Sequence, residues 1–172
     1  FFLSSFLSGQ YIISSTLEVV QPQRYMLTTD DDPPNCNNPV ETVGGTIQTV
    51  EHCARMAPVV LSGSTAVEGE RAELVLAAHS NLQGPVVLFT NPINENINMN
   101  QVMTGIDVRI LEGNQGAYGV EARGAQGTSV QDATIYVGTG YAGIVGGAGS
   151  GGSHVQVTVI GGQVGMDLSS AQ

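Results

Sequence analysis

Short runs of alternating and β-branched apolar residues recur at a regular spacing along the last third of the chain. Three of these runs, at residues 105–110, 130–135 and 155–160, follow one another at equal intervals. A second set of apolar runs lies between these three, at residues 118–120, 142–144 and 164–166. Strand-like units of about 22–25 residues with glycine-rich corners, and without a helical pattern, predict a solenoid of stacked parallel strands.

The first hundred residues are less regular. Residues 28–45 are rich in Asp, Asn and Pro, which predicts a loop. Residues 66–80 fit either a helix or a strand that ends at His79 and Ser80. Other strands are predicted at residues 11–13, 16–20, 46–50, 58–61 and 85–89. We therefore expect one partial domain over residues 1–172, with irregular first coils and long loops in residues 1–100 and regular coils in residues 101–172.

Composition and charge narrow the range of partners. The chain has 172 residues, five arginines, no lysine and fifteen carboxylates, which give a formal net charge of −10. An acidic surface repels phosphate backbones and anionic membranes, so we expect neither nucleic acid nor a membrane as partner. A polyanionic glycan would need a bridging cation or a local arginine cluster, so a neutral glycan is at least as plausible a ligand.

The two cysteines, Cys36 and Cys53, lie in the irregular first third. A disulfide between them would fit an oxidising compartment, but spacing alone does not decide between a disulfide and two buried thiols. The run Asp30–Asp32 fits a solvated turn better than a calcium site, because consecutive carboxylates do not converge without a specially bent backbone. No metal site is predicted.

A glycine pattern at residues 138–143 matches the dinucleotide fingerprint G-x-G-x-x-G. That fingerprint functions only where it opens a helix, and the glycine-rich run at residues 146–152 does not sustain one. Tight corners of a solenoid explain these glycines better, and no cofactor is expected.

Several segments carry a family resemblance through their order and spacing. Residues 9–14 read GQYIIS and residues 30–34 read DDDPP. An ordered series of glycine-containing segments follows, at residues 105–107, 114–120, 125–130, 140–144 and 161–166. Together these segments resemble the pectate-lyase superfamily in its rhamnogalacturonase/epimerase-like branch, and most closely the exo-β-1,3-glucanase type. The family usually has a proline before the glycine of the first segment, whereas Leu7 and Ser8 precede Gly9 here.

The resemblance implies an all-β fold, a right-handed single-stranded parallel β-helix of the pectin-lyase-like type, that acts on polysaccharide outside the cell. It supplies no catalytic residue, because in glucanase-like members the catalytic carboxylates lie in a later β-helical region. An open last coil would expose unpaired strand edges. We therefore expect the chain to be a fragment whose partner is the remainder of a longer β-helical chain.

The sharpest chemical hypothesis concerns Asp107 and Asp132, which the repeat places at equivalent positions one coil apart. Stacked strands would set the two residues about 4.8 Å apart, which suits the carboxylate pair of a retaining glycosidase. A solvated outward charge ladder is the alternative. With Ile106 pointing inward, Asp107 and Arg109 point outward, and Tyr136 follows on the next coil.

Further polar residues are candidates for substrate binding. Arg109 and Tyr136 could orient a sugar, and Glu121 and Arg123 either line the same groove or form a simple surface pair. Four asparagines alternate along one predicted strand face, which is either a sugar-binding row or a solvated face. They are Asn94, Asn96, Asn98 and Asn100.

With the resemblance, the sequence is expected to be the N-terminal β-helical portion of a secreted glycoside hydrolase acting on β-glucan. A pectate or rhamnogalacturonan lyase is the second hypothesis, and the shortage of cations counts against it. A non-catalytic β-helix that binds glycan or builds an extracellular structure is the third.

Overall fold

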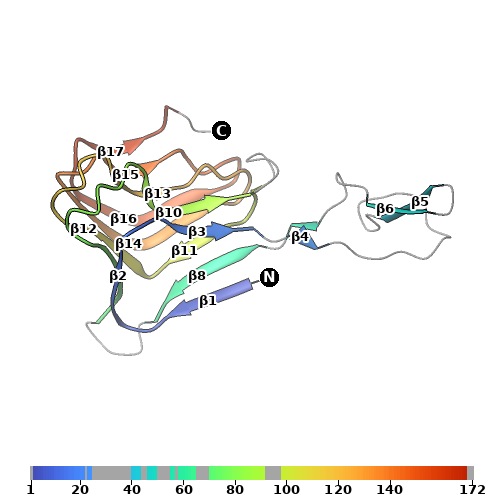
Figure 1. Cartoon of the computed structure of the whole chain (residues 1–172), viewed down its shortest axis with the longest axis horizontal. Coiled ribbons are helices and arrows are strands. Elements are labelled where there is room, and N and C mark those ends of the chain that lie inside the picture. Colours follow the sequence, from blue (N-terminus) through green and yellow to red (C-terminus); the bar gives the residue numbers. More distant parts are fainter. Residues whose placement is uncertain are drawn as a thin grey trace. The chain divides into compact units, whose positions relative to one another are not determined.

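The computed structural model of the chain describes residues 2–21, 23–24, 40–43, 46–49, 55–56, 58–64, 70–91 and 98–169 (Figure 1). Strands, turns and bends account for the regular structure, and no helix lies among these residues. The chain divides into two compact units, Phe1–Gln21 with Pro58–Gln172, and Pro22–Ala57. The prediction of an all-β chain with parallel strands is confirmed.

Three sets of strands build the larger unit, and every pairing between its strands is parallel. The first set is β1 (Phe2–Phe6), β8 (Val59–Gly63) and β11 (Val102–Thr104). The second set is β2 (Gly9–Ile13), β9 (Ala72–Leu76) and β12 (Ile106–Ile110). The third set is β3 (Leu17–Val20), β10 (Pro85–Thr90), β13 (Tyr118–Glu121), β15 (Ala142–Val145) and β17 (Val164–Asp167), which form a five-stranded sheet.

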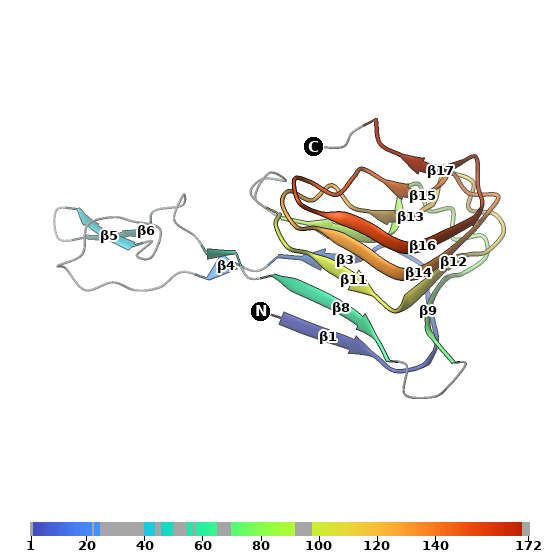
Figure 2. The same cartoon turned by 180° about the vertical axis from the view of Figure 1, so that it is seen from behind.

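A long strand, β14 (Ser129–Gly138), joins the first two sets, and a second long strand, β16 (Ser153–Gly161), pairs with β14 and completes an eight-stranded sheet. The first half of β14 pairs with β11 and its second half pairs with β12. Figure 2 shows β1, β8, β11, β14 and β16 stacked in this order. The chain therefore passes from one set of strands to the next and returns to stack each strand on an earlier one.

A left-handed backbone position marks the corner inside the long strands. Asp132 has a φ of 46° and Gln156, which lies opposite it, has a φ of 54°. Gly105, between β11 and β12, has a φ of 68°. Only residues that tolerate left-handed backbone angles can turn the chain at these positions without an added loop, and glycine adopts such angles at the lowest steric cost.

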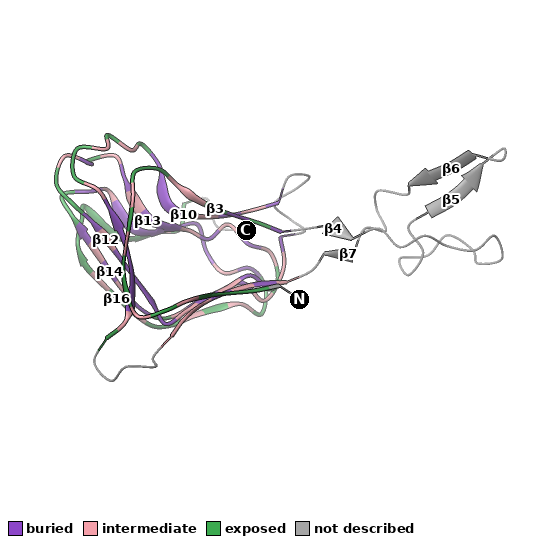
Figure 3. Ribbon diagram, turned by 60° about the horizontal axis from the view of Figure 1, so that its bottom comes forward, coloured by how far each residue is buried: buried purple, intermediate pink, exposed green. Residues whose placement is uncertain are grey.

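Every second residue along the strands of the second set points inward, and these apolar side chains fill the core. Ile106, Val108 and Ile110 are buried, as are Leu74 and Leu76 on the preceding strand. In Figure 3, buried segments are also seen along β10 and β13 of the five-stranded sheet. The inward assignment of Ile106, Val108 and Ile110 is thereby confirmed, and removing these side chains from water is the main stabilising term.

The spacing between stacked strands is less uniform than the sequence predicts. Leu74 pairs with Val108, Val108 with Ile135 and Ile135 with Val159, so each step along the chain is shorter than the step before it. The predicted period matches the sequence separation between paired residues in the last coils. It is too short for the earlier coils, because the connections between their strands are longer.

Three local predictions have definite outcomes. Of the two alternatives for residues 66–80, the strand is correct in type, but β9 occupies Ala72–Leu76 and so ends before the predicted end at His79 and Ser80. Residues 40–43, which composition assigned to a loop, form a strand of the smaller unit. Asn98 is fully buried and donates a hydrogen bond to the Phe89 carbonyl, so it belongs to no solvated row, and Asn94 and Asn96 lie outside the described residues.

The described residues of the smaller unit form two short antiparallel pairs. Strands β5 (Val40–Val43) and β6 (Thr46–Thr49) pair with each other, and β4 (Gln23–Arg24) pairs with β7 (Arg55–Met56). Cys36, Cys53 and the run Asp30–Asp32 lie outside the described residues, so the disulfide and the turn predicted there remain predictions.

Candidate functional site

Polar side chains gather on the outer face of the second set of strands. Parallel register places Gln10 of β2 beside Glu73 of β9, and Glu73 beside Asp107 of β12. The next outward position of β12 is Arg109, which lies beside Tyr136 of β14. Because these residues alternate with the buried apolar positions of the same strands, they point away from the core.

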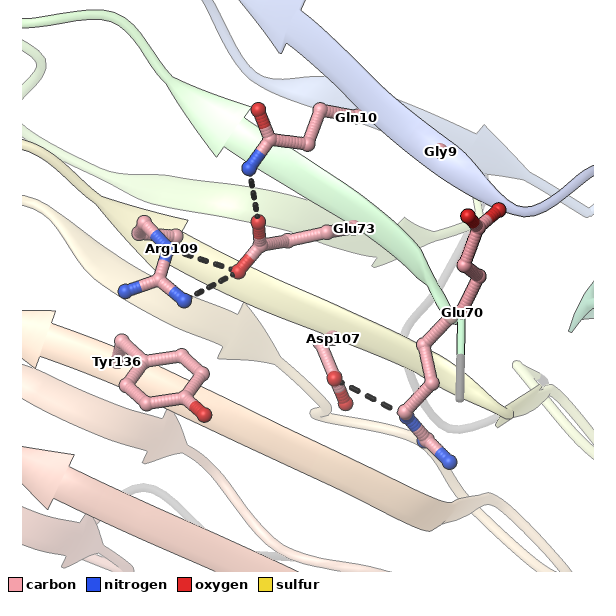
Figure 4. A pocket seen from close by; sticks show the side chains of 8 residues that line it. Gly9, Gln10, Glu70, Glu73, Asp107, Arg109 and Tyr136 are labelled. Carbon is pink, nitrogen blue, oxygen red and sulfur yellow. Dashed lines mark hydrogen bonds and ion pairs between the residues drawn. The ribbon is translucent and has the colours of Figure 1, made fainter. Parts of the chain in front are cut away.

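These side chains line a groove of about 330 Å³. Figure 4 shows the side chains that line it and the bonds among them. The lining residues come from β2, β9, β12 and β14 and from the end of the connection before β9. They are Gly9, Gln10, Glu70, Arg71, Glu73, Asp107, Arg109 and Tyr136.

Glu73 is the centre of the first polar cluster. Both Nε and Nη2 of Arg109 lie 2.7 Å from its Oε1 atom. The Gln10 amide donates to its Oε2 atom at 2.8 Å. The Glu73 side chain is only 11% exposed, so both of its oxygens are satisfied within the protein.

Arg71 is the centre of the second polar cluster. Its Nε atom donates to Asp107 Oδ2 at 3.0 Å, and its Nη1 atom lies 3.2 Å from both carboxylate oxygens of Asp132. Its Nη2 atom donates to the Asp132 carbonyl. The Asp107 Oδ1 atom also accepts a bond from the Thr134 backbone N–H at 2.8 Å. One guanidinium therefore ties the start of β9 to β12 and to the corner within β14.

Tyr136 extends the groove beside Arg109. The guanidinium carbon of Arg109 lies 3.9 Å from the centroid of the Tyr136 ring, which is cation–π geometry. The same arginine thus contacts a carboxylate on one neighbouring strand and an aromatic ring on the other.

The pKa of each arginine follows from these contacts. The hydrogen bond to Glu73 raises the pKa of Arg109. Burial lowers the pKa of Arg71, but the charge of Asp107 and the bonds to Asp132 outweigh this and raise it overall. Both groups are fixed cations whose charge is already matched by carboxylates.

The predicted stacking of Asp107 on Asp132 is wrong. The register of β12 on β14, in which Val108 pairs with Ile135, brings Asp107 beside Thr134 and not beside Asp132. Asp132 occupies the corner, with 51% of its side chain exposed. Arg71 nevertheless bridges the two carboxylates, because its guanidinium contacts both.

Sequence reasoning found Asp107, Arg109 and Tyr136, and it missed Gln10, Glu70, Arg71 and Glu73. Glu73 and Asp107 pair across neighbouring strands, but their separation along the chain is longer than the predicted repeat. The only available signal was that Glu73 and Arg71 alternate with the apolar residues of β9.

Glu121 and Arg123 are not among the residues that line the groove. Glu121 ends β13 in the five-stranded sheet, and its Oε1 atom lies 3.0 Å from Arg123 Nε. The Tyr118 hydroxyl donates to the other oxygen of Glu121, and burial followed by this bond raises the pKa of Tyr118. Their proposed role in substrate binding stays a prediction, now at a place separate from the groove.

No protein-family model, curated protein or solved structure matches the chain. Within the described residues no cluster of three or more His, Cys, Asp or Glu side chains is suited to hold a metal ion. The described part of the chain also contains no helix of the length and apolarity that a membrane span requires.

Proposed function

We propose that the chain is part of a right-handed, single-stranded parallel β-helix that binds a β-linked glycan in the groove over β2, β9, β12 and β14. The three sets of parallel strands support this fold, because a crossover between parallel strands of one sheet is almost always right-handed. The family resemblance of the sequence supports a polysaccharide ligand, an extracellular location and, for the intact protein, hydrolysis of β-glucan.

The observation that carries the proposal is the composition of the groove. Carboxylates, an amide and guanidinium groups offer donors and acceptors to sugar hydroxyls, and Tyr136 adds an aromatic side chain. The ion pairs of Glu73 and Asp107 hold these groups in place on a rigid sheet, which reduces the entropy lost on binding.

The ion pairs also favour a neutral glycan over a polyuronate. Arg109 is bound to Glu73, and Arg71 is shared by Asp107 and Asp132. Neither guanidinium of the groove is free to bind a uronate without displacing a carboxylate. This argues against the pectate or rhamnogalacturonan lyase hypothesis.

For hydrolysis, the register favours Glu73 and Asp107 over the pair Asp107 and Asp132. Glu73 and Asp107 lie side by side on neighbouring strands. Neighbouring strands are about 4.8 Å apart, close to the separation of about 5–5.5 Å between the carboxyl groups of retaining glycosidases.

Binding of laminari- and cello-oligosaccharides, measured by isothermal titration calorimetry, tests the proposal. We expect Glu73→Gln and Tyr136→Ala each to weaken binding by about tenfold, equivalent to about 1.4 kcal/mol. Glu112→Gln, at an exposed carboxylate that does not line the groove, should leave affinity unchanged. Equal affinities for all four proteins would contradict a glycan site at this groove.

Reducing-sugar release from the same oligosaccharides tests hydrolysis separately. Loss of activity in Glu73→Gln and Asp107→Asn, with activity kept in Asp132→Asn, would support the register-based pair. Binding without any release would leave the non-catalytic β-helix as the function of this chain.

A further inference from the structure

We propose that the groove selects β-linked glycans that carry protonated amino groups, such as glucosamine polymers, over otherwise identical neutral chains. This inference rests on the proposed function and names the ligand class of the same site. It follows from the balance of charge in the groove.

Carboxylates outnumber cations around the groove. Glu70, Glu73 and Asp107 line it, and Asp132 contacts its edge through Arg71. Only Arg71 and Arg109 oppose these four carboxylates among the described residues that line the groove, which leaves a formal excess of two negative charges.

The excess negative charge lies on Glu70 and on the two aspartates, Asp107 and Asp132, that share Arg71. Arg109 neutralises Glu73 one to one, whereas Arg71 serves both Asp107 and Asp132. Glu70 is exposed at the rim of the groove and makes no ion pair with any residue that the structure describes. Glu70 therefore presents a carboxylate that a ligand cation can approach without displacing an arginine.

A sugar ammonium matches this surface in both charge and hydrogen bonding. It carries donors and no acceptor, so it complements a carboxylate that has no ion pair with the described part of the chain. The net charge of −10 and the absence of lysine add a long-range attraction for cationic polymers and a repulsion for polyuronates.

Three oligomers of equal length and linkage separate charge from shape. They are β-1,4-linked hexamers of glucosamine, of N-acetylglucosamine and of glucose, and only the first carries amino charges. Calorimetry with the wild-type chain at a pH that keeps the amines protonated should show the glucosamine hexamer binding about three- to fivefold more tightly than either neutral hexamer, the size expected of one exposed ion pair.

Two variants locate the source of that preference. Glu70→Gln should lower the affinity for the glucosamine hexamer more than the affinity for the neutral hexamers, so that most of the preference is lost. Glu112→Gln removes one exposed carboxylate away from the groove and should keep the preference.

Three results would overturn the inference. Equal affinity of the wild type for charged and neutral hexamers would refute the selectivity while leaving glycan binding in place. An equal loss of preference in both variants would assign the attraction to overall charge and not to the groove. If no β-1,4-linked hexamer binds, the inference fails, and the titration with laminari-oligosaccharides decides the proposed function separately.

Discussion

His154 shows how the position of one side chain in the stack sets its ionisation. It lies beside the buried Val130 in the register of β14 and β16. The Val130 N–H donates to His154 Nδ1 at 3.2 Å, and His154 Nε2 is buried without a hydrogen-bond partner among the described atoms. An imidazole that accepts at Nδ1 is neutral, and burial lowers its pKa.

The stability of the larger unit should therefore fall in mild acid. In the unfolded chain His154 binds a proton near pH 6.5, and in the folded chain it does so only at lower pH. The free energy of unfolding is therefore highest above about pH 6.5 and decreases as the pH falls below that value. Urea unfolding at several pH values measures this slope. His154→Gln should flatten it, and His79→Asn, at an exposed histidine, should leave it unchanged. The same slope in wild type and His154→Gln would contradict the assignment.

A second titration effect belongs to Asp167. The Tyr141 hydroxyl donates to its Oδ2 atom at 2.5 Å and the Ser169 N–H donates to Oδ1 at 2.9 Å. These bonds lower the pKa of Asp167 to about 2. Its stabilising contribution is present above its unfolded pKa, near 4, and is lost as the pH falls toward 2.

Removing the Tyr141 hydroxyl should raise the pKa of Asp167 toward its usual value. NMR titration of the Asp167 carboxyl carbon in Tyr141→Phe measures this change directly. Tyr136→Phe, which removes a hydroxyl on the other sheet, is the matched control and should leave the pKa at about 2. An unchanged pKa in Tyr141→Phe would show that the Ser169 backbone bond alone is sufficient.

At the scale of elements, glycines allow β13 and β15 to lie close to β14 and β16. A Cβ atom on Gly143 would come within 2.5 Å of Val159 Cγ2 and 2.8 Å of the Gly165 carbonyl oxygen. A Cβ atom on Gly119 would come within 2.5 Å of Ile135 Cγ2. The two sheets therefore meet at a distance that excludes even a methyl group at these positions.

Replacing a glycine by alanine should lower the free energy of unfolding at Gly143 and should have little effect at Gly165, one coil later. Gly143→Ala should lower the free energy of unfolding by about 1–3 kcal/mol, the usual cost of overpacking a core. Gly165→Ala occupies the neighbouring position on β17, where a Cβ atom would meet nothing within 4 Å, and should change stability by less than about 0.5 kcal/mol. Urea unfolding measures both, and equal effects would contradict the close approach.

Strand identity and facing could be read from the sequence, whereas register could not. Alternation around Ile106 correctly placed Asp107 and Arg109 outward, and the apolar run at residues 85–89 became β10. The register between β12 and β14 depends on the length of the intervening connection and on the left-handed turn at Asp132. Neither leaves an apolar periodicity, so the contact between Asp107 and Thr134 could not be predicted. Gln10, Glu70, Arg71 and Glu73 were missed because β2, β9 and β12 stack on one another through connections longer than the predicted repeat.

At the scale of the whole larger unit, burial decreases toward the last coil. Ala142 and Ile144 of β15 are fully buried, whereas Val164 and Met166, which pair with them one coil later, are 36% and 37% exposed. Among the described residues, β16 pairs only with β14 and β17 only with β15. The outer edges of both strands therefore present backbone groups that no described strand pairs with.

This gradient predicts how the stack opens. In a stack whose units contact only their neighbours, a strand held on one side opens at a lower free-energy cost than one held on both sides. Amide hydrogen exchange should be slowest in β12 and β13, which are paired on both sides, and faster in β16 and β17. Within β16, the N–H groups bonded to β14 should exchange more slowly than those that point away from it. Uniform protection across all four strands, independent of protein concentration, would contradict stepwise opening and would require the last coil to unfold together with the core.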